Sequence, residues 1–126
     1  MSSTQISQLT SDQIAGVSAD GLNTFTTDEI ASLSTAQIGA LTWNQLNGLQ
    51  VNKIAAFTSS QISQLTSLQI TGITPDGLNT FSATEMASLT AAQLAGLRPT
   101  QIAGLSTANI GALTATQIAS FTPEQI

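Results

Sequence analysis

The sequence contains no cysteine, histidine or tyrosine, and only 7% of its 126 residues are charged. The absence of cysteine excludes disulfides and thiolate metal sites. The absence of both histidine and cysteine removes the side chains that most often act as catalytic bases, nucleophiles and metal ligands. Only Lys53 and Arg98 are basic, against seven acidic residues, and the net charge is −5. Two separated bases cannot neutralise a row of phosphates, so we expect no nucleic-acid partner.

Long apolar runs are also missing. No run approaches the roughly 20 residues that a membrane-spanning helix needs, and no charged-then-apolar signal segment opens the chain, so we expect no membrane insertion. Hydrophobic residues nevertheless make up 41% of the sequence, which indicates a packed core rather than a disordered segment. The length fits a single domain, 1–126. Met1 is interpreted as an initiator placed on a segment of a longer array.

What the sequence does contain is one eight-residue phrase, repeated from end to end. An aliphatic residue recurs at every eighth position from Ile6 to Ile126, and a second apolar residue recurs from Leu9 to Phe121. Neither row is interrupted, and no linker or second domain is visible. Residues three apart share one face of a helix but lie on opposite faces of a strand, so this spacing favours helices.

Four signals place a helix start in every octad. The first position is Ser or Thr except at Gln50 and Arg98, and Gln or Glu most often follows three residues later. This is the spacing of a capping box, in which two side chains and two backbone N–H groups pair reciprocally. Each proline directly follows a cap position, where its missing N–H is tolerated. All seven acids lie at the second or third helical position, where the helix dipole favours negative charge.

A single continuous helix is excluded by geometry. Eight residues at about 100° each advance the apolar pair by roughly 80° per octad, so the apolar stripe would wind around the axis. The sequence therefore predicts an all-α solenoid of about 16 short capped helices, with an aliphatic interior and capped ends facing outward. Small residues between the apolar pair would let successive helices approach closely. The Thr and Ile content leaves a β-solenoid as the alternative, although proline at one fixed position fits it poorly.

A longer period overlies the octad. The segment QISQLTSDQIAGVSADGLNTF at 5–25 recurs as QISQLTSLQITGITPDGLNTF at 61–81, an offset of 56 residues or seven octads. The match indicates a duplication that relates about 5–49 to 61–105. A chain that grows by whole blocks changes its length without changing its repeat, so natural selection can act on the length itself.

The phrase LTxxQI, as in LTSDQIAGV, LTAAQLAGL and LTATQIASF, resembles the octapeptide repeat arrays of large repetitive bacterial surface and secreted proteins. The likeness covers essentially the whole chain. It implies a stalk or scaffold segment of an exported, adhesin-like protein, with an extracellular or cell-surface location. No functional residue follows from this resemblance.

The acidic residues are the first candidates for chemistry. Asp28 stands beside Glu29, and Glu85 occupies the equivalent place seven octads later. A carboxylate pair would suit acid–base catalysis, but acids at a helix start are interpreted as partners of the helix dipole. The ADGLN and PDGLN segments resemble part of a calcium loop, yet the other ligand positions are missing. We predict no catalytic, cofactor-binding or metal site, and no enzymatic activity.

Three further residues stand out from the pattern. Trp43 follows a cap, Lys53 replaces the usual Gln, and Arg98 replaces a cap. Each would suit a contact surface, but surface packing and sequence drift are the favoured interpretations.

The function expected from these observations is that of a structural spacer whose length scales with the number of octads. The alternative is a binding module that presents a Thr, Gln or Ser ladder on one solenoid face to a glycan, a protein or ice. Internal repeats at both termini, with Ile6 and Ile126 at the edges, predict weak end-to-end self-association.

Overall fold

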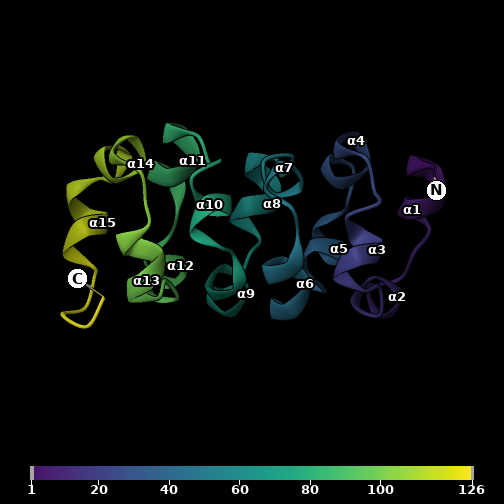
Figure 1. The fold of residues 1–126 in the computed structure, drawn as a ribbon, viewed down its shortest axis with the longest axis horizontal. Coiled ribbons are helices and arrows are strands. Elements are labelled where there is room, and N and C mark those ends of the chain that lie inside the picture. The colour runs from purple at the N-terminus through teal and green to yellow at the C-terminus, as the bar shows by residue number, and fades with distance from the viewer. Residues whose placement is uncertain (1, 126) are drawn as a thin grey trace.

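The computed structural model describes residues 2–125 and is elongated, with the two termini at opposite ends (Figure 1). Within these residues the chain forms fifteen helices of four to six residues and no strand, so the predicted helical solenoid is confirmed and the β-solenoid is wrong. The helices are α1 (Ser3–Ser7), α2 (Ser11–Ala15), α3 (Ala19–Leu22), α4 (Thr27–Ala31), α5 (Thr35–Gly39), α6 (Trp43–Gly48), α7 (Val51–Ile54), α8 (Ser59–Ser63), α9 (Ser67–Gly72), α10 (Pro75–Leu78), α11 (Ala83–Ser88), α12 (Ala91–Ala95), α13 (Pro99–Ala103), α14 (Thr107–Ala112) and α15 (Ala115–Ala119).

Helix α2 shows how one octad makes one helix. At its start, the Thr10 hydroxyl accepts from the Gln13 backbone N–H at 3.2 Å, and Gln13 Oε1 accepts from the Thr10 N–H at 2.9 Å. At its end, the Val17 N–H donates to the Ile14 carbonyl at 3.1 Å, which tightens the last turn. The next cap, Ser18, is extended, with φ −67° and ψ 160°. The chain therefore bends and restarts every eight residues.

Each helix from α1 to α11 packs on the helix three places later in the chain. The contacting pairs run from α1 with α4, and α2 with α5, through α11 with α14. Three octads therefore make one turn of the solenoid, and the helices form three stacks along its length. Because isolated helices of five residues are unstable in water, this stacking is what holds each one folded.

The two apolar rows form the core. From Ile6 to Leu94 the first row is at most 2% exposed, and the second row is buried from Phe25 to Leu97. The expectation that Ile6 lies at an open edge is wrong, because its side chain is 0% exposed beneath the following turn. The second-row residues Leu9 and Val17 are the partly exposed ones at the N-terminal end. Ile126 lies outside the described residues.

As far as residue 125, the sixteenth octad does not form the helix predicted for it. Residues 123–125 are a turn, and their part of the chain makes one short backbone bond, from the Gln125 N–H to the Thr122 carbonyl at 3.0 Å. The cap arrangement survives in part, because Gln125 Oε1 accepts from the Thr122 N–H at 2.9 Å. Part of the capping arrangement is therefore present without a helix in the described residues of this octad.

Glycine marks the closest approaches between stacked helices. Gly72 at the end of α9 lies over Trp43 at the start of α6, and a Cβ there would stand 2.8 Å from the Trp43 carbonyl oxygen and 3.2 Å from its Cα. Both of these are backbone atoms, which cannot swing aside. By contrast, a Cβ on Gly111 in α14 would meet nothing within 4 Å. Gly72 thus allows a close approach of the kind predicted for small residues, but between helices three places apart in the chain and not between successive helices.

We expect Gly72→Ala to destabilise the protein by about 1–3 kcal/mol, because the added methyl forces α9 away from α6. Gly111→Ala is the matched control, and we expect it to stabilise the fold by up to about 1 kcal/mol through helix propensity alone. Urea unfolding followed by circular dichroism measures both. Equal effects of the two substitutions would show that the turns are not in close contact at Gly72.

Candidate functional site

The glutamine at the fourth octad position makes the most frequent long-range side-chain contact. Gln69 Oε1 accepts from the Thr66 N–H at 2.9 Å, which completes the capping box of α9. Its Nε2 donates to the carbonyls of Ile38 and Leu41 at 2.9 and 2.8 Å. One amide thus joins the start of a helix to the end of a helix in the previous turn. The same arrangement recurs at Gln37, Gln45, Gln61, Gln93, Gln101, Gln117 and Gln125.

These eight corner glutamines are buried, with exposed fractions from 0% to 7%. The prediction that the capped ends face outward is therefore wrong for this side chain. The cause is the bend between octads, which places two backbone carbonyl groups inside the corner. Hydrogen bonds within the preceding helix do not use all of the acceptor capacity of these carbonyls. An unsatisfied buried carbonyl costs about 1–3 kcal/mol, and the amide of the next turn removes that cost.

One corner lacks the glutamine and is completed differently. The octad of α7 carries Lys53 at the fourth position, and a lysine side chain cannot accept a hydrogen bond. The Gln50 N–H donates instead to Asn23 Oδ1 at 2.8 Å, and Asn23 Nδ2 donates to the Gly48 carbonyl at 2.9 Å. An asparagine in the preceding turn therefore closes the corner.

A second corner repeats this solution. In the octad of α14 the fourth residue is Asn109, and the Ser106 N–H donates to Asn79 Oδ1 at 2.7 Å. Asn79 Nδ2 donates to the Gly104 carbonyl at 2.9 Å. Sequence reasoning missed the roles of Asn23 and Asn79 and instead weighed their segments as part of a calcium loop. Their position in the sequence was the available signal. Each asparagine lies four octads before an octad whose fourth residue is neither Gln nor Glu.

The carboxylates singled out from the sequence act as caps. Glu29 Oε1 accepts from the Thr26 N–H at 2.8 Å, and Glu85 Oε1 accepts from the Ser82 N–H at 2.9 Å. The second oxygen of Glu85 accepts from the Ser59 hydroxyl at 3.3 Å. Among the described residues, no group of three or more carboxylates could hold a metal ion.

Two of the three exceptional residues, Trp43 and Arg98, make contacts within the chain. Trp43 is half-buried beneath Gly72, and Arg98 Nε donates to the Thr71 carbonyl at 3.2 Å. Lys53 is half-buried on α7. Packing within the solenoid accounts for Trp43 and Arg98.

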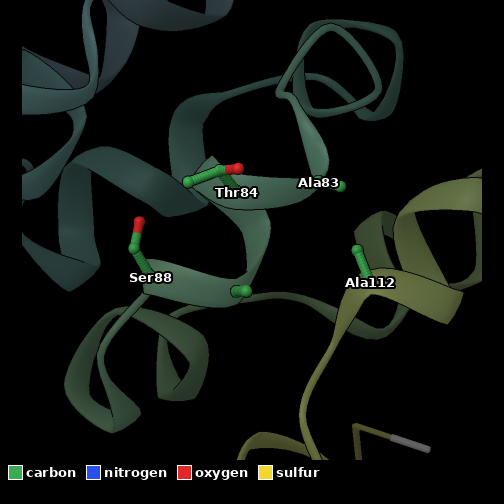
Figure 2. Close-up of a pocket in the computed structure, with 5 residues that line it drawn as sticks. Ala83, Thr84, Ser88 and Ala112 are labelled. Atoms are coloured by element: carbon green, nitrogen blue, oxygen red, sulfur yellow. The ribbon is translucent and has the colours of Figure 1, made fainter.

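A shallow depression of about 480 Å³ lies between α11 and α14. Figure 2 shows Ala83, Thr84 and Ser88 on one ribbon and Ala112 on the neighbouring one. Ala87 completes the lining, and the Ser88 hydroxyl donates to the Glu85 carbonyl at 2.8 Å. No charged side chain lines the depression. It offers small side chains and hydroxyls, without the base that a hydroxyl nucleophile requires.

The helices of residues 2–125, at four to six residues each, are all too short to span a membrane. No curated protein and no solved structure matches the chain. Residues 86–123 match the family model of the ALTTAQ repeat, and this segment contains ALTATQ at 112–117 in register with the octad. The match supports a repeat-containing module.

Proposed function

We propose that this chain is a structural spacer, a stalk segment of a larger bacterial exported, adhesin-like protein at the cell surface or outside the cell. The observation that carries the proposal is the equivalence of the octads. From α4 to α14 each helix makes the same stacking contact three octads back, and eight octads add, through their glutamine, the same corner contact four octads back. A fold held by such nearest-turn contacts can be lengthened without redesign.

The location in this proposal rests on the resemblance to octapeptide arrays of bacterial surface and secreted proteins. The expected lack of catalysis rests on the missing histidine and cysteine. With only Lys53 and Arg98 as bases, we propose no nucleic-acid partner.

A one-sided binding ladder is less well supported, because the side chains that would form it are used internally. The Thr66 hydroxyl accepts from the Gln69 N–H at 3.2 Å, and Gln69 itself is buried. The matching segments 5–25 and 61–81 also place their equivalent helices on different sides of the solenoid. Helix α3 belongs to the stack with α6, α9 and α12, whereas α10 belongs to the stack with α7 and α13. A seven-octad block is not a whole number of turns, so its features do not align along one face.

Deleting one octad tests the spacer directly. We expect removal of residues 58–65 to leave a folded protein that is shorter by one octad's share of its length, because the octad register is preserved. This deletion also keeps both asparagine corners, since Asn23 with Gln50 and Asn79 with Ser106 lie wholly on one side of it. Small-angle X-ray scattering measures the maximum dimension, and circular dichroism measures the helix content.

Deleting only residues 58–61 is the matched control. It shifts both apolar rows by half an octad relative to the preceding turns, so we expect loss of cooperative unfolding. A protein that tolerates this half-octad deletion, or one whose length does not change with whole octads, would contradict the spacer proposal.

A further inference from the structure

One boundary between turns, in the middle of the solenoid, lacks the glutamine contact at two successive corners. Across residues 37–125, the fourth residue of every octad carries a side-chain amide except at Lys53, Gly77 and Glu85. Lys53 stands alone between two glutamine octads, whereas Gly77 and Glu85 belong to successive octads. Their helices, α10 and α11, pack on α7 and α8. We call the boundary between these two pairs of helices the seam.

Gly77 offers no donor to the turn before it. In a corner closed by glutamine, such as that of Gln69, the amide donates to the carbonyls 31 and 28 residues earlier. The same positions before Gly77 are Leu46 and Leu49, and glycine has no side chain to reach them. The Leu46 carbonyl accepts from the Leu49 N–H at 3.3 Å, and the Leu49 carbonyl has no donor within residues 2–125. This corner therefore has no side-chain hydrogen bond to the next turn.

Glu85 caps its own helix but brings a carboxylate to the corner below it. Its Oε1 accepts from the Ser82 N–H at 2.9 Å, as a glutamine would. The equivalent carbonyls before it are those of Ile54 and Phe57, and an ionised carboxylate has no hydrogen to donate to them. The Phe57 carbonyl has no donor in the described part of the chain. Glu85 Oε2 accepts instead from the exposed Ser59 hydroxyl at 3.3 Å, and among the described residues this is the only hydrogen bond across the seam.

Apolar packing holds the seam closed. Ile54 and Phe57 on one side are 1% and 4% exposed, and Leu78 and Phe81 on the other side have the same two values. A Cβ on Gly77 would lie 3.4 Å from Ile54 Cγ1, so the two sides are in contact. Apolar contact is non-directional. The seam is therefore packed like the other boundaries but lacks the directional bonds that fix them.

The two unbonded corners flank one edge of the solenoid. The octad of α10, 74–81, begins at the Gly77 corner and ends at the Glu85 corner, and α10 packs on α7. The third corner is bonded, because Gln69 and Gln93 both donate to carbonyls of the previous turn. These two glutamines are three octads apart and lie at the same corner of successive turns. Separation at the α7–α10 edge therefore leaves the third corner as a pivot.

We propose that the seam is a hinge, at which the α7–α10 edge opens while the turns on either side remain folded. Opening breaks no glutamine contact, and it lets water reach the Leu49 and Phe57 carbonyls, which offsets part of the lost apolar contact. As a hinge of a stalk, the inference rests on the proposed spacer function. The same pair occurs 56 residues earlier as Gly21 and Glu29, so it belongs to the seven-octad block.

Thiol reactivity tests the hinge, because the chain has no cysteine of its own. Leu78→Cys places a thiol at the seam. Leu94→Cys is the matched control in α12, whose octad lies between the bonded corners of Gln93 and Gln101. The two leucines are 1% and 0% exposed. The rate of reaction with a small disulfide reagent is measured at increasing urea concentrations below the unfolding transition.

We expect the Leu78→Cys thiol to react at least about ten-fold faster than the Leu94→Cys thiol, as for a buried group reached by local opening. Its rate should depend only weakly on urea, because local opening exposes little surface. The rate for Leu94→Cys should rise steeply with urea, as global unfolding does. This difference in slope does not depend on how much stability each substitution removes.

Glu85→Gln, combined with Leu78→Cys, tests whether the missing amide is the cause. Gln keeps the acceptor for the Ser82 N–H and adds a donor for the carbonyls of Ile54 and Phe57. We expect the thiol reaction to slow by about five-fold or more, since a bonded corner must then break before the seam opens. Asp76→Asn is the matched control, because it removes the same charge from an exposed side chain on α10, and it should leave the rate unchanged.

Three results would overturn the proposal. These are equal rates with the same steep urea dependence at the two thiols, a Glu85→Gln substitution that does not slow the reaction, and an equal slowing by Asp76→Asn, which would assign the effect to charge. None of them bears on whether monomer length follows octad number, so the spacer proposal is judged separately.

Discussion

Ile62→Asp should unfold the protein or cost more than about 4 kcal/mol of stability, the size of effect expected when an unpaired charge enters a packed core. Ile62 in α8 is 2% exposed, within an apolar row that is uninterrupted from Ile6 to Leu94. The substitution removes aliphatic packing and places a carboxylate in the core. Neither apolar row contains a basic residue that could pair with it. Urea unfolding followed by circular dichroism measures the change.

Ser60→Asp is the control on the same helix. Ser60 is exposed in the first turn of α8, where the helix dipole favours negative charge. We expect this variant to lie within about 0.5 kcal/mol of the original, as for most surface substitutions. Equal tolerance of Ile62→Asp and Ser60→Asp would mean that the first apolar row does not face the core.

The helices were predictable because each octad carries its own local signals. In α4, for example, Thr26 and Glu29 form the capping box predicted from their spacing, and Ile30 with Leu33 supplies the buried pair. Local signals do not depend on how the turns are arranged, so the sequence was sufficient for them. They also overstate the helix count in one place, because the Thr122 N–H can donate to Gln125 Oε1, as in a capping box, without a helix following in the described residues.

The number of octads per turn was not predictable from the same signals. It depends on the backbone angles at the corners, such as those of the extended residues Leu49 and Gln50, which set the angle between successive helices. The sequence does hold one clue to the contacts between turns. A capping box needs only an acceptor at the fourth position, which Gln and Glu both provide, yet Gln is far commoner there. That excess reports the second role of the side chain, as a donor to the previous turn.

This second role leads to the other large effect that we expect, from Gln93→Glu. Glu preserves the acceptor for the Thr90 N–H, as Glu29 and Glu85 do in their own octads. It removes the donor to the Ile62 and Leu65 carbonyls and places a carboxylate beside them, at a side chain that is 3% exposed. We expect a loss of about 2–4 kcal/mol near pH 7, because the Leu65 carbonyl loses its donor, the Ile62 carbonyl keeps only the Leu65 N–H at 3.1 Å, and a buried charge is desolvated.

The loss should depend on pH, because protonation of the introduced carboxylate removes its charge and restores one donor. Burial and the two carbonyl oxygens raise the pKa of the introduced carboxyl above its ordinary value of about 4.3. The folded state then binds the proton more tightly than the unfolded state, so the variant's stability falls as pH rises between the unfolded and folded pKa values. Below about pH 4 the protonated carboxyl can donate to one carbonyl, and part of the deficit relative to the original chain should disappear.

Gln13→Glu provides the matched control, since Gln13 makes the same capping box but is exposed and has no earlier turn within the chain to contact. At low protein concentration its stability should stay within about 0.5 kcal/mol of the original at every pH. A loss at Gln13 as large as at Gln93 would assign the effect to the capping box, and the corner contact between turns would then contribute nothing. A loss at Gln93 alone that diminishes in acid would identify the donated amide hydrogen bonds as what holds successive turns together.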